Sequence, residues 1–328
     1  MLEKLTNING VCGNEDNIRS FIIENLKESV ESIDIDPLGS LITSQQGGMP
    51  YPRVMIVAHM DEVGFIVTTI HEDGTIGFSP SGGVYEHVID SKNVVIGTNH
   101  IPGIIRMGES FEKSYIDIGS TSRDETLQIV DVGDFIAFKT CFGPLGGASI
   151  KAKALDDRTG CFVLMNIMAS KKWDFPIYGV FSSQEEVGER GALSASYRVQ
   201  PHIGIVLEGT VCSDLPTVEP YRHSTTLGGG PAISIADSTS CFDVELSEIL
   251  CKLAEEKGIP WQRRRIMGGG NDGGVVHLSG SGARTVTISV PCRYIHSSVS
   301  VANLEDVQNT IHLVETFLSW LNKGDLSK

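Results

Sequence analysis

Basic residues are scarce in this chain of 328 residues, which has 26 Lys and Arg against 41 Asp and Glu and a formal net charge of −15. Nucleic acids and anionic membranes bind clustered positive charge, so this balance argues against both as partners. The longest basic run is Arg263-Arg264-Arg265, inside a strand-like segment. We interpret this run as a solvated strand face or a contact between subunits.

Long hydrophobic runs are also missing. No apolar stretch approaches the ~20 residues that a membrane-spanning helix requires. The first residues, Met1 to Leu5, contain no hydrophobic signal region. The seven cysteines are scattered without a Cys-x-x-Cys pair, which fits a reducing compartment better than a disulfide framework or a zinc knuckle. We therefore expect a cytoplasmic protein.

Two common catalytic motifs are absent as well. The sequence has neither the Gly-x-Ser-x-Gly turn of serine hydrolases nor a phosphate-binding P-loop. Cys161 and Cys292 lie close in sequence to candidate site residues, but cysteines in apolar surroundings are usually small core residues. The chemistry of this chain is therefore expected from its carboxylates and histidines.

Strands and helices alternate in two parts of the chain. The expected strands cover residues 33–42 (a pair), 54–58, 175–180, 203–207, 232–235, 261–267 and 285–290. The expected helices cover residues 14–30 with Asn14 as N-cap, 154–168, a segment ending near 197, 243–256 and 304–321. This alternation predicts an α/β domain with a mostly parallel sheet flanked by helices.

From Gly64 to about Gly147 the pattern changes to short β-rich runs separated by Gly, Asp-Gly and Pro-Gly turns, with no convincing helix. Such spacing predicts a small barrel or sandwich. The expected strands cover residues 65–70, 75–78, 88–96, 100–105, 115–118, 127–130 and 135–139. We therefore expect a catalytic α/β domain in two parts, 1–67 and 151–328, with an inserted β-rich domain at 68–150.

Two adjacent carboxylates, Glu185 and Glu186, follow the apolar strand at 175–180. On an extended backbone, neighbouring side chains point to opposite faces. The two acids are therefore suited to different tasks, because one can hold a metal ion while the other reaches a water or a proton.

Other polar residues stand at or just after predicted strand ends: His59, Asp156, Glu208 and His296. The carboxyl ends of parallel strands meet at one edge of the sheet, where α/β proteins bind ligands. Histidines with carboxylates suit zinc, cobalt or manganese. A two-metal site needs a bridging carboxylate, plus a histidine and a carboxylate for each ion. The set supplies these and leaves one acid as a base, while Asp61 can accept the second ring N–H of His59.

Each residue also has a simpler interpretation. A single histidine at a strand end is usually hydrogen-bonded or solvated, and Asp156-Asp157 can be the N-cap and charged first turn of a helix. Glu208 can be a surface acid, and Glu185-Glu186 can begin a helix. Their joint position at successive strand ends favours a site, because independent surface acids are not expected to mark one edge.

Five segments resemble the dinuclear metallo-aminopeptidases of the tetrahedral (TET) family, which includes glutamyl, leucyl and deblocking aminopeptidases and members labelled endoglucanase-like. These segments are AHMDEVGFIV (58–67), KALDDRTG (153–160), SSQEEVGERGA (182–192), VLEGT (206–210) and VPCRYIHSS (290–298). The resemblance runs from GVCGNEDNIRSFI (10–22) to the last helix. It implies hydrolysis of the N-terminal residue of peptides, and dimers formed through the β insertion that can build a hollow dodecamer.

The resemblance also implies a role for each candidate residue and two divalent ions per subunit, zinc or cobalt first and manganese next. It implies that Asp156 bridges the two ions and that Glu185 is the general base. The remaining implied roles are His59 and Glu208 as ligands of one ion, Glu186 and His296 as ligands of the other, and Asp61 as the partner of His59.

Two positions depart from the family pattern. Many relatives have Asp where this chain has Glu208, and Gly-Thr-Asp where it has Gly270-Asn271-Asp272.

The alternative functions, in order, are another dinuclear amide hydrolase (a dipeptidase, carboxypeptidase or deacylase), a glycosidase and a non-catalytic assembly protein. Glycosidase carboxylates flank a bond at ~5–9.5 Å, which neighbours on one strand do not do.

Overall fold

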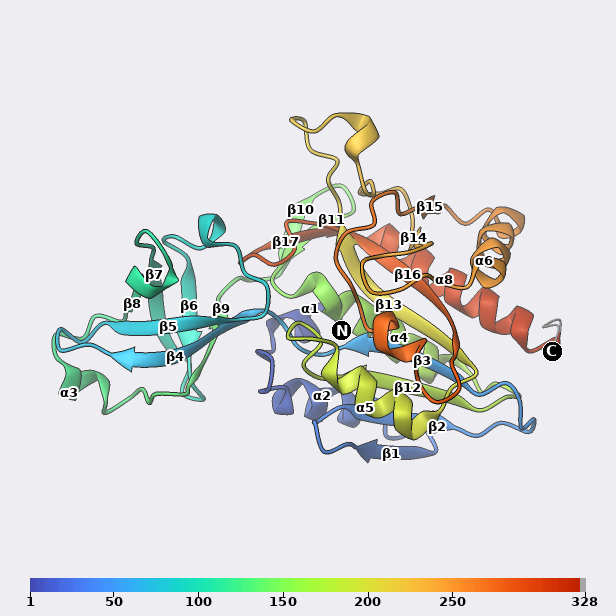
Figure 1. The fold of residues 1–328 in the computed structure, drawn as a ribbon, viewed down its shortest axis with the longest axis horizontal. Helices are drawn as coiled ribbons and strands as arrows, with labels where there is room; N and C mark the ends of the chain where they lie inside the picture. The colour runs from blue at the N-terminus through green and yellow to red at the C-terminus, as the bar shows by residue number, and fades with distance from the viewer. Residues whose placement is uncertain (325–328) are drawn as a thin grey trace.

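The computed structural model describes residues 1–324, and its main body is an 11-stranded sheet with helices on both faces (Figure 1). The strands of its main path, in spatial order, are β1 (Ser32–Ile35), β2 (Leu41–Gln45), β12 (Ile177–Ser182), β3 (Val54–His59), β13 (Ile203–Val211), β16 (Arg284–Arg293), β17 (Ser300–Asn303), β11 (Ser149–Ala152) and β10 (Gly143–Gly146). The central four, β12, β3, β13 and β16, are parallel, and antiparallel strands extend the sheet on both sides.

The register of the parallel strands sets where their ends lie. His59 at the end of β3 pairs with Ser182 at the end of β12, and Val57 pairs with Val206 of β13. All six residues of β3 are buried, as expected for a strand with helices on both faces. The carboxyl ends of β12, β3 and β13 therefore meet at one edge.

Helices cover the two faces unequally. The larger core contains residues of α1 (Leu2–Asn7), α2 (Asp16–Leu26), α4 (Leu155–Ser170), α6 (Val244–Lys257) and α8 (Leu304–Leu321). A smaller core on the other face contains residues of α5 (Arg190–Val199) and α7 (Gly273–Val276). Alternate residues of the central strands enter one core or the other: Ile56 and Ala58 the larger, Met55 and Val57 the smaller.

Two short strands, β14 (Ala232–Ile233) and β15 (Gln262–Arg263), extend the sheet beyond β16. The predicted strand at 261–267 is therefore too long. The main-chain N–H of Arg264 still bonds to Ile233, but that of Arg265 bonds to Ser224 instead, because β14 has ended. The chain then enters a glycine-rich loop.

The inserted segment forms a closed six-stranded barrel beside the main body (Figure 1). Its strands, in order around the barrel, are β4 (Gly64–Ile70), β5 (Ile76–Ser81), β8 (Tyr115–Asp117), β7 (Ile101–Arg106), β6 (Asn93–Ile96) and β9 (Phe135–Phe138). The neighbouring pairs are antiparallel, and the interior has its own core with Phe65, Phe78 and Phe138 in edge-on contacts. The single-turn elements η1 (Glu86–Val88), η2 (Phe111–Lys113) and η3 (Pro220–Arg222) complete the fold.

Three further local predictions are wrong. The predicted strand at 88–96 begins too early, since η1 ends at Val88 and β6 begins at Asn93. Residues 127–130 are not a strand, because Ser122 caps the short helix α3 (Arg123–Thr126) and the following N–H groups bond back to that turn. Asn14 is not the cap of α2. The preceding residue of that helix is Glu15, whose carboxylate instead accepts the N–H groups of Gly13 and Gln184.

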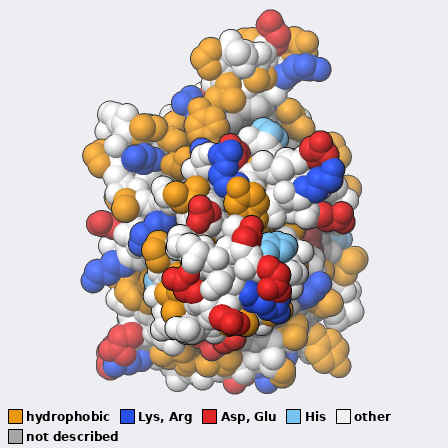
Figure 2. All heavy atoms as spheres, turned by 90° about the vertical axis from the view of Figure 1, so that its left-hand side faces the viewer, with side chains coloured by type: hydrophobic (Ala, Val, Ile, Leu, Met, Phe, Trp, Pro, Cys, Tyr) orange, Lys and Arg blue, Asp and Glu red, His pale blue; other side chains and the backbone are white. Residues whose placement is uncertain are grey.

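The α/β fold with an inserted small barrel confirms the predicted fold class. Within residues 1–324, no helix is long and apolar enough to cross a membrane. The barrel-side view in Figure 2 has acidic side chains interspersed with Lys and Arg, not a continuous basic surface. The cytoplasmic location stays a prediction.

Candidate metal centre

The structure brings all six predicted polar residues to the sheet edge where the central strands end. Five of them, all except Glu185, form two groups whose ligand atoms lie within 4.8 Å of one another, and Asp156 belongs to both. In the first group, His59 Nε2 lies 3.4 Å from Asp156 Oδ1 and 3.3 Å from Glu208 Oε1. In the second, His296 Nε2 lies 3.5 Å from Asp156 Oδ2 and 3.3 Å from Glu186 Oε2. Each oxygen of Asp156 therefore faces a different histidine.

The ring of His59 is fixed by its second nitrogen. Nδ1 lies 3.1 Å from the main-chain oxygen of Asp61 and 3.5 Å from the Asp61 carboxylate. The ring is fully buried at the end of β3, and the thiol of Cys161 donates to the His59 carbonyl at 3.1 Å. Such contacts hold Nε2 in position to accept a metal ion.

The second histidine is oriented by the segment that follows the barrel strand β5. His296 Nδ1 lies 2.9 Å from the main-chain oxygen of Gly83. A Cβ on Gly83 would stand 3.2 Å from the same nitrogen, so the close approach requires a small residue there. The barrel and the α/β domain therefore meet at this histidine.

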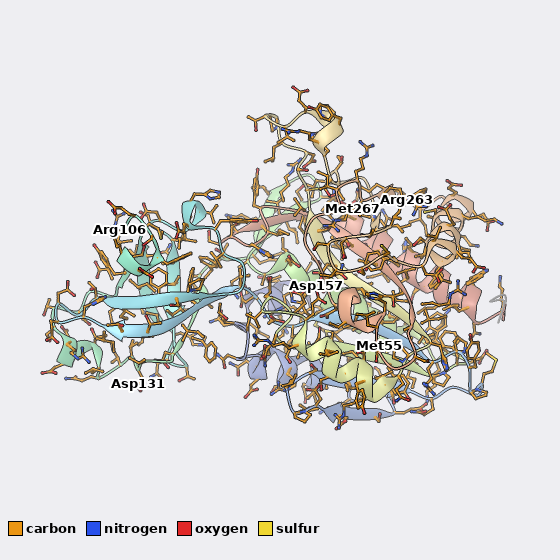
Figure 3. All side chains as sticks on the ribbon, viewed as in Figure 1. Met55, Arg106, Asp131, Asp157, Arg263 and Met267 are labelled. Carbon is orange, nitrogen blue, oxygen red and sulfur yellow. The ribbon has the colours of Figure 1, made fainter. Side chains whose placement is uncertain are left out.

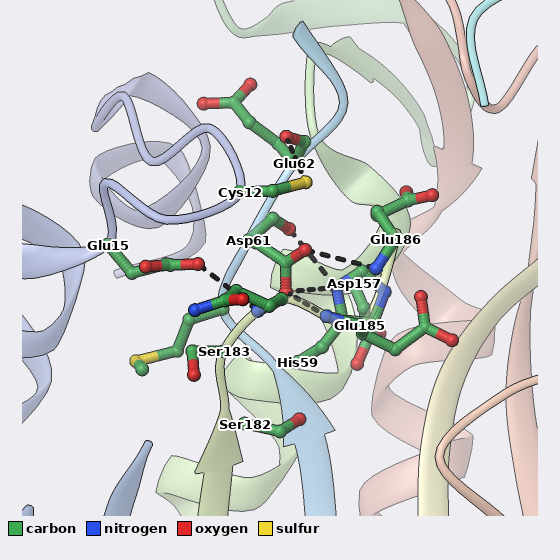
Figure 4. Close-up of polar contacts among 12 residues, drawn as sticks. Cys12, Glu15, His59, Asp61, Glu62, Asp157, Ser182, Ser183, Glu185 and Glu186 are labelled. Atoms are coloured by element: carbon green, nitrogen blue, oxygen red, sulfur yellow. Dashed lines mark hydrogen bonds and ion pairs between the residues drawn. The ribbon is translucent and has the colours of Figure 1, made fainter. Parts of the chain in front are cut away.

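Asp61 also holds the turn that carries Glu185 and Glu186 (Figure 4). Its carboxylate accepts the main-chain N–H of Glu185 at 2.9 Å and that of Glu186 at 3.1 Å. The predicted extended backbone at the two glutamates is wrong, because β12 ends at Ser182 and Gln184 has φ 55°. The turn lets only Glu186 approach His296, while Glu185 remains outside both ligand groups.

Asp156 and Asp157 stand at the start of α4 with non-helical backbone angles. The Asp157 carboxylate accepts the N–H of Gly160 at 2.8 Å, so the helix-capping interpretation applies to Asp157 and leaves Asp156 to face the histidines. β13 passes closely beside it, since a Cβ on Gly209 would stand 2.9 Å from the Asp156 Cα atom.

The electrostatics of the site follow from crowded acids in a buried space. Burial raises the pKa of Glu185 well above its usual value, and the charges of Asp272 and Glu186 raise it further, against the opposing effect of His59. Burial likewise raises the pKa of Glu186 to about 7. Asp156 differs: burial raises its pKa, but the close contacts and charges of the two histidines outweigh burial and hold the pKa below its usual value.

Sequence reasoning missed several residues around the centre. Asp272 is buried, and one of its oxygens accepts the hydroxyl hydrogen bond of Ser182. Lys153 and Glu62 form a buried ion pair, with Nζ 2.5 Å from Oε1. Lys153 and Glu62 belong to segments that resemble the family. A charged residue inside an apolar run was the sequence signal that could have pointed to this buried pair. Asn271 accepts the N–H of Gly273 at 2.9 Å, a local turn contact.

The chemistry of the donor atoms fits a bound metal ion. Asp156 Oδ1 and Glu208 Oε2 are buried without a hydrogen-bond partner, although buried polar atoms are normally paired. Imidazole nitrogens and carboxylate oxygens are ligands of zinc and neighbouring transition metals. The orphaned oxygens therefore fit cation binding.

An α/β sheet whose edge gathers histidine and carboxylate ligands is the architecture of a metal-dependent hydrolase. A model of the family described as M42 glutamyl aminopeptidase matches residues 39–313. A putative aminopeptidase of Acetivibrio thermocellus is 39% identical over 322 residues, 96% of this chain and 96% of its own. The chain belongs to the M42 glutamyl aminopeptidase family.

Solved structures agree with this assignment. An aminopeptidase of the archaeon Desulfurococcus kamchatkensis has a TM-score of 0.94 at 32% identity, covering 99% of this chain and 97% of that chain. The TET1 peptidase of Pyrococcus horikoshii, which can assemble into a tetrahedron or a large octahedral shell, has a TM-score of 0.87 at 28% identity, with 97% and 98% covered. The protein is therefore a metal-dependent aminopeptidase of the TET type, and the resemblance seen in the sequence is confirmed.

Proposed function

We propose that this protein removes the N-terminal residue of peptides with a site that holds two divalent ions, and that Glu185 is its general base. The observation that carries the proposal is the position of Asp156, whose two oxygens face two separate His–Glu pairs. One bridging carboxylate with a histidine and a carboxylate on each side is the donor set of a two-metal hydrolase.

The separations between donor atoms support this ligand set. The four His–carboxylate distances lie between 3.3 and 3.5 Å. Ligands on a tetrahedral zinc ion at ~2.0–2.1 Å would lie about 3.3 Å from one another. His59 and Glu208 would hold one ion and His296 and Glu186 the other, with Asp156 common to both. Zinc and cobalt fit the donors best, followed by manganese.

When bound, the ions supply Lewis acidity and lower the pKa of water at the site. The protein's own contribution is proton transfer by Glu185. Its buried carboxyl group has a pKa raised by its surroundings, so it can hold a proton taken from the attacking water and release it to the leaving amine. The hydrogen bond from its main-chain N–H to Asp61 fixes the turn from which this side chain extends.

The substrate is a peptide with a free α-amine. Asp156, Glu186 and Glu208 would be offset by the two divalent ions when these are bound, so the free-amine requirement is proposed from the family to which the chain belongs. The family match favours the aminopeptidase within the class of dinuclear amide hydrolases.

The assembly is proposed by likeness to the TET1 peptidase of Pyrococcus horikoshii, which can form a tetrahedron. We infer a homo-oligomer in which 68–150 is the dimerisation domain and 1–67 with 151–328 is the catalytic domain, and dimers build a dodecamer. Sedimentation velocity tests this: a species of about twelve chain masses supports it, and a stable monomer contradicts it.

The function is tested with aminoacyl-p-nitroanilides and their N-acetylated counterparts, using chelated protein and protein reloaded with Zn(II), Co(II) or Mn(II). Metal-dependent release from free-amine substrates only is the expected result. Release from the acetylated substrates indicates a deacylase. Absence of release with two ions bound indicates a dipeptidase or carboxypeptidase, and absence of bound metal indicates a non-catalytic protein. Hydrolysis of cellulose derivatives after chelation would indicate a glycosidase.

A further inference from the structure

The turn that follows β12 is held by side chains from other parts of the chain. It belongs to the site in the middle of the main body, where Figure 3 labels Asp157, the chain neighbour of Asp156. Among residues 1–324, none of the main-chain N–H groups of residues 183–186 donates to a main-chain oxygen. Each of the four donates to a side-chain oxygen instead. The acceptors, in the order of the donors, are Ser40 Oγ, Glu15 Oε1 and the two oxygens of Asp61.

Glu15 reaches this turn from the start of α2, 169 residues earlier in the chain (Figure 4). Its side chain is buried, and Oε1 accepts the main-chain N–H of Gln184 at 3.2 Å and that of Gly13 at 2.7 Å. Burial raises the pKa of the Glu15 carboxyl group, and the charge of Asp61 raises it further, against the opposing effect of the accepted N–H groups. A buried acid beside another acid is unfavourable for stability, so stability alone does not account for its place here.

The helix that follows Glu15 does not account for the buried carboxylate either. An acid at this position commonly caps the free N–H groups of the first helical turn. Glu15 precedes α2, but its side chain makes no capping hydrogen bond to that helix. Its carboxylate is directed to the loop at Gly13 and to the turn at Gln184 instead. The contact outside its own segment is therefore the one with the turn that carries the proposed base.

Gln184 needs such support because of its backbone conformation. Its φ is 55°, in the left-handed region that residues other than glycine seldom adopt. Glu15 holds the peptide unit that contains the N–H of Gln184, and Asp61 holds the next unit, which contains the N–H of Glu185. The peptide units on both sides of the Gln184 Cα atom are thus fixed from outside. Because φ and ψ are the rotations that relate these two units, the two acids together specify the left-handed conformation.

We propose that Glu15 is a positioning residue for the reaction, because it holds Gln184 in the left-handed conformation and so sets the point from which Glu185 extends. The inference rests on the proposed function, since it takes Glu185 as the general base. Metal binding depends less on this contact, because Glu186 has its own main-chain bond to Asp61 and its carboxylate lies 3.3 Å from a ring nitrogen of His296. Loss of the Glu15 acceptor should therefore lower kcat and leave KM and metal content nearly unchanged.

The first test compares two substitutions of Glu15 in metal-reloaded enzyme. Glu15→Ala removes the acceptor, so kcat should fall about 10- to 100-fold, the range for a displaced catalytic group, while both ions stay bound. Glu15→Gln keeps an oxygen for the same N–H groups and should retain most of the wild-type kcat. The matched control is Asp306→Ala. Asp306 is also a buried acid in the first turn of a helix, accepts the N–H groups of Gly228 and Gly230 at 2.7 Å, and belongs to neither ligand group. It should lower stability without lowering kcat.

Substitutions of Gln184 test the same contact from the other side. Glycine adopts the left-handed conformation without a steric penalty, so Glu15→Ala should cost much less kcat in the Gln184→Gly background than in the wild type. A β-branched residue opposes this conformation, so Gln184→Val should lower kcat although Glu15 is intact. This second variant tests the proposal even if Glu15→Ala does not fold.

Amide exchange of chelated protein supplies a measurement that does not depend on turnover. Exchange in peptides covering residues 181–190 should be faster in Glu15→Ala than in wild type, and close to wild type in Glu15→Gln. Wild-type kcat in Glu15→Ala, an equal loss of kcat in Glu15→Gln, or loss of a bound ion in Glu15→Ala overturns the proposal. Absence of wild-type turnover of every free-amine substrate contradicts the proposed function instead, and amide exchange then decides whether Glu15 holds the turn.

Discussion

The carboxylate of Asp61 accepts the main-chain N–H of Glu185 at 2.9 Å, and its other oxygen accepts that of Glu186 at 3.1 Å (Figure 4). Asp61 is fully buried just beyond β3, whereas the glutamates follow β12. One carboxylate therefore ties the turn that carries the proposed base to the segment that carries His59. A displacement of that turn would therefore disturb both metal binding and proton transfer.

Replacing Asp61 by Asn tests this connection. The amide keeps the shape but has one acceptor oxygen, so one of the two N–H groups loses its partner and the ring of His59 loses a nearby charge. We expect kcat to fall about 10- to 100-fold with weaker metal binding, as for other groups that orient ligands. Steady-state kinetics and metal analysis of dialysed protein measure both effects.

The control for this variant is Asp36→Asn. Asp36 is also buried and belongs to neither ligand group, and one of its oxygens accepts the N–H groups of Leu38 and Ser40 at 2.9 Å. It should lower stability without lowering kcat. Equal kcat values for wild type and Asp61→Asn would show that the turn is held by other contacts.

The division of labour between the adjacent glutamates gives a second prediction. Glu185→Gln should reduce kcat by about 10²- to 10⁴-fold, the usual contribution of a general base, while both ions remain bound. Glu186→Gln should lose one ion, because that carboxylate lies 3.3 Å from His296 Nε2. Metal content by mass spectrometry and turnover of the best p-nitroanilide measure the two outcomes. Metal loss in Glu185→Gln would mean that base and ligand have been assigned the wrong way round.

The buried ion pair of Lys153 and Glu62 gives a prediction about stability. Both side chains are 3% exposed, and Glu62 also accepts the N–H of Gly10 at 3.0 Å. Lys153→Met leaves the buried Glu62 carboxylate with only the more distant Arg158, whose Nη2 lies 3.8 Å from Oε1, so the free energy of unfolding should fall by up to about 3–5 kcal/mol. Urea denaturation of chelated protein measures it.

Two further variants test whether burial of the charge causes this loss of stability. In the double variant Lys153→Met with Glu62→Gln, part of the lost stability should return, because the Glu62 charge is gone while Arg158 loses its contact with that charge. Lys27 and Glu24 form an exposed ion pair at 2.9 Å, and Lys27→Met should change stability by less than ~1 kcal/mol. A similar loss in both single variants would contradict the assigned role of burial.

Glu189 gives a prediction about pH. Burial raises its pKa to about 7, with further contributions from the negative charges of Asp272 and Asp237. Its carboxyl group lies against a tight turn, since a Cβ on Gly274 would stand 2.5 Å from one of its oxygens. Between the unfolded pKa of ~4.3 and the folded value, the folded state binds more protons, so stability falls as pH rises through this window.

The measurement is the urea midpoint of chelated protein at pH 5 and at pH 8. Wild type should lose stability from this group over the interval, and Glu189→Gln should remove that part of the loss because the amide does not titrate. Glu112→Gln, an exposed acid in the barrel, serves as the control and should keep the wild-type difference. An identical pH dependence in Glu189→Gln would rule out Glu189 as the titrating group.

Much of the fold could be predicted because its signals are local. The continuous apolar run of β3 and the helical spacing of α8 depend on the burial of those residues alone, and residues 304–321 form α8 as predicted. The wrong predictions lie where contacts with neighbouring segments determine the backbone conformation. Residues 127–130 are rich in β-forming side chains, yet the capped helical turn of α3 beside them sets their conformation instead. Residues 264–267 leave the sheet because their partner strand β14 is short.

The sequence by itself determined which residues are candidates for the site, because a strand end in an α/β sheet is a position that chain order reveals. Only the tertiary structure decided how they combine. In the folded protein, one oxygen of Asp156 faces each histidine, and the Asp61 carboxylate accepts hydrogen bonds from the main chain of the glutamates. Such assignments depend on the register between strands far apart in the chain, and no local pattern contains that register.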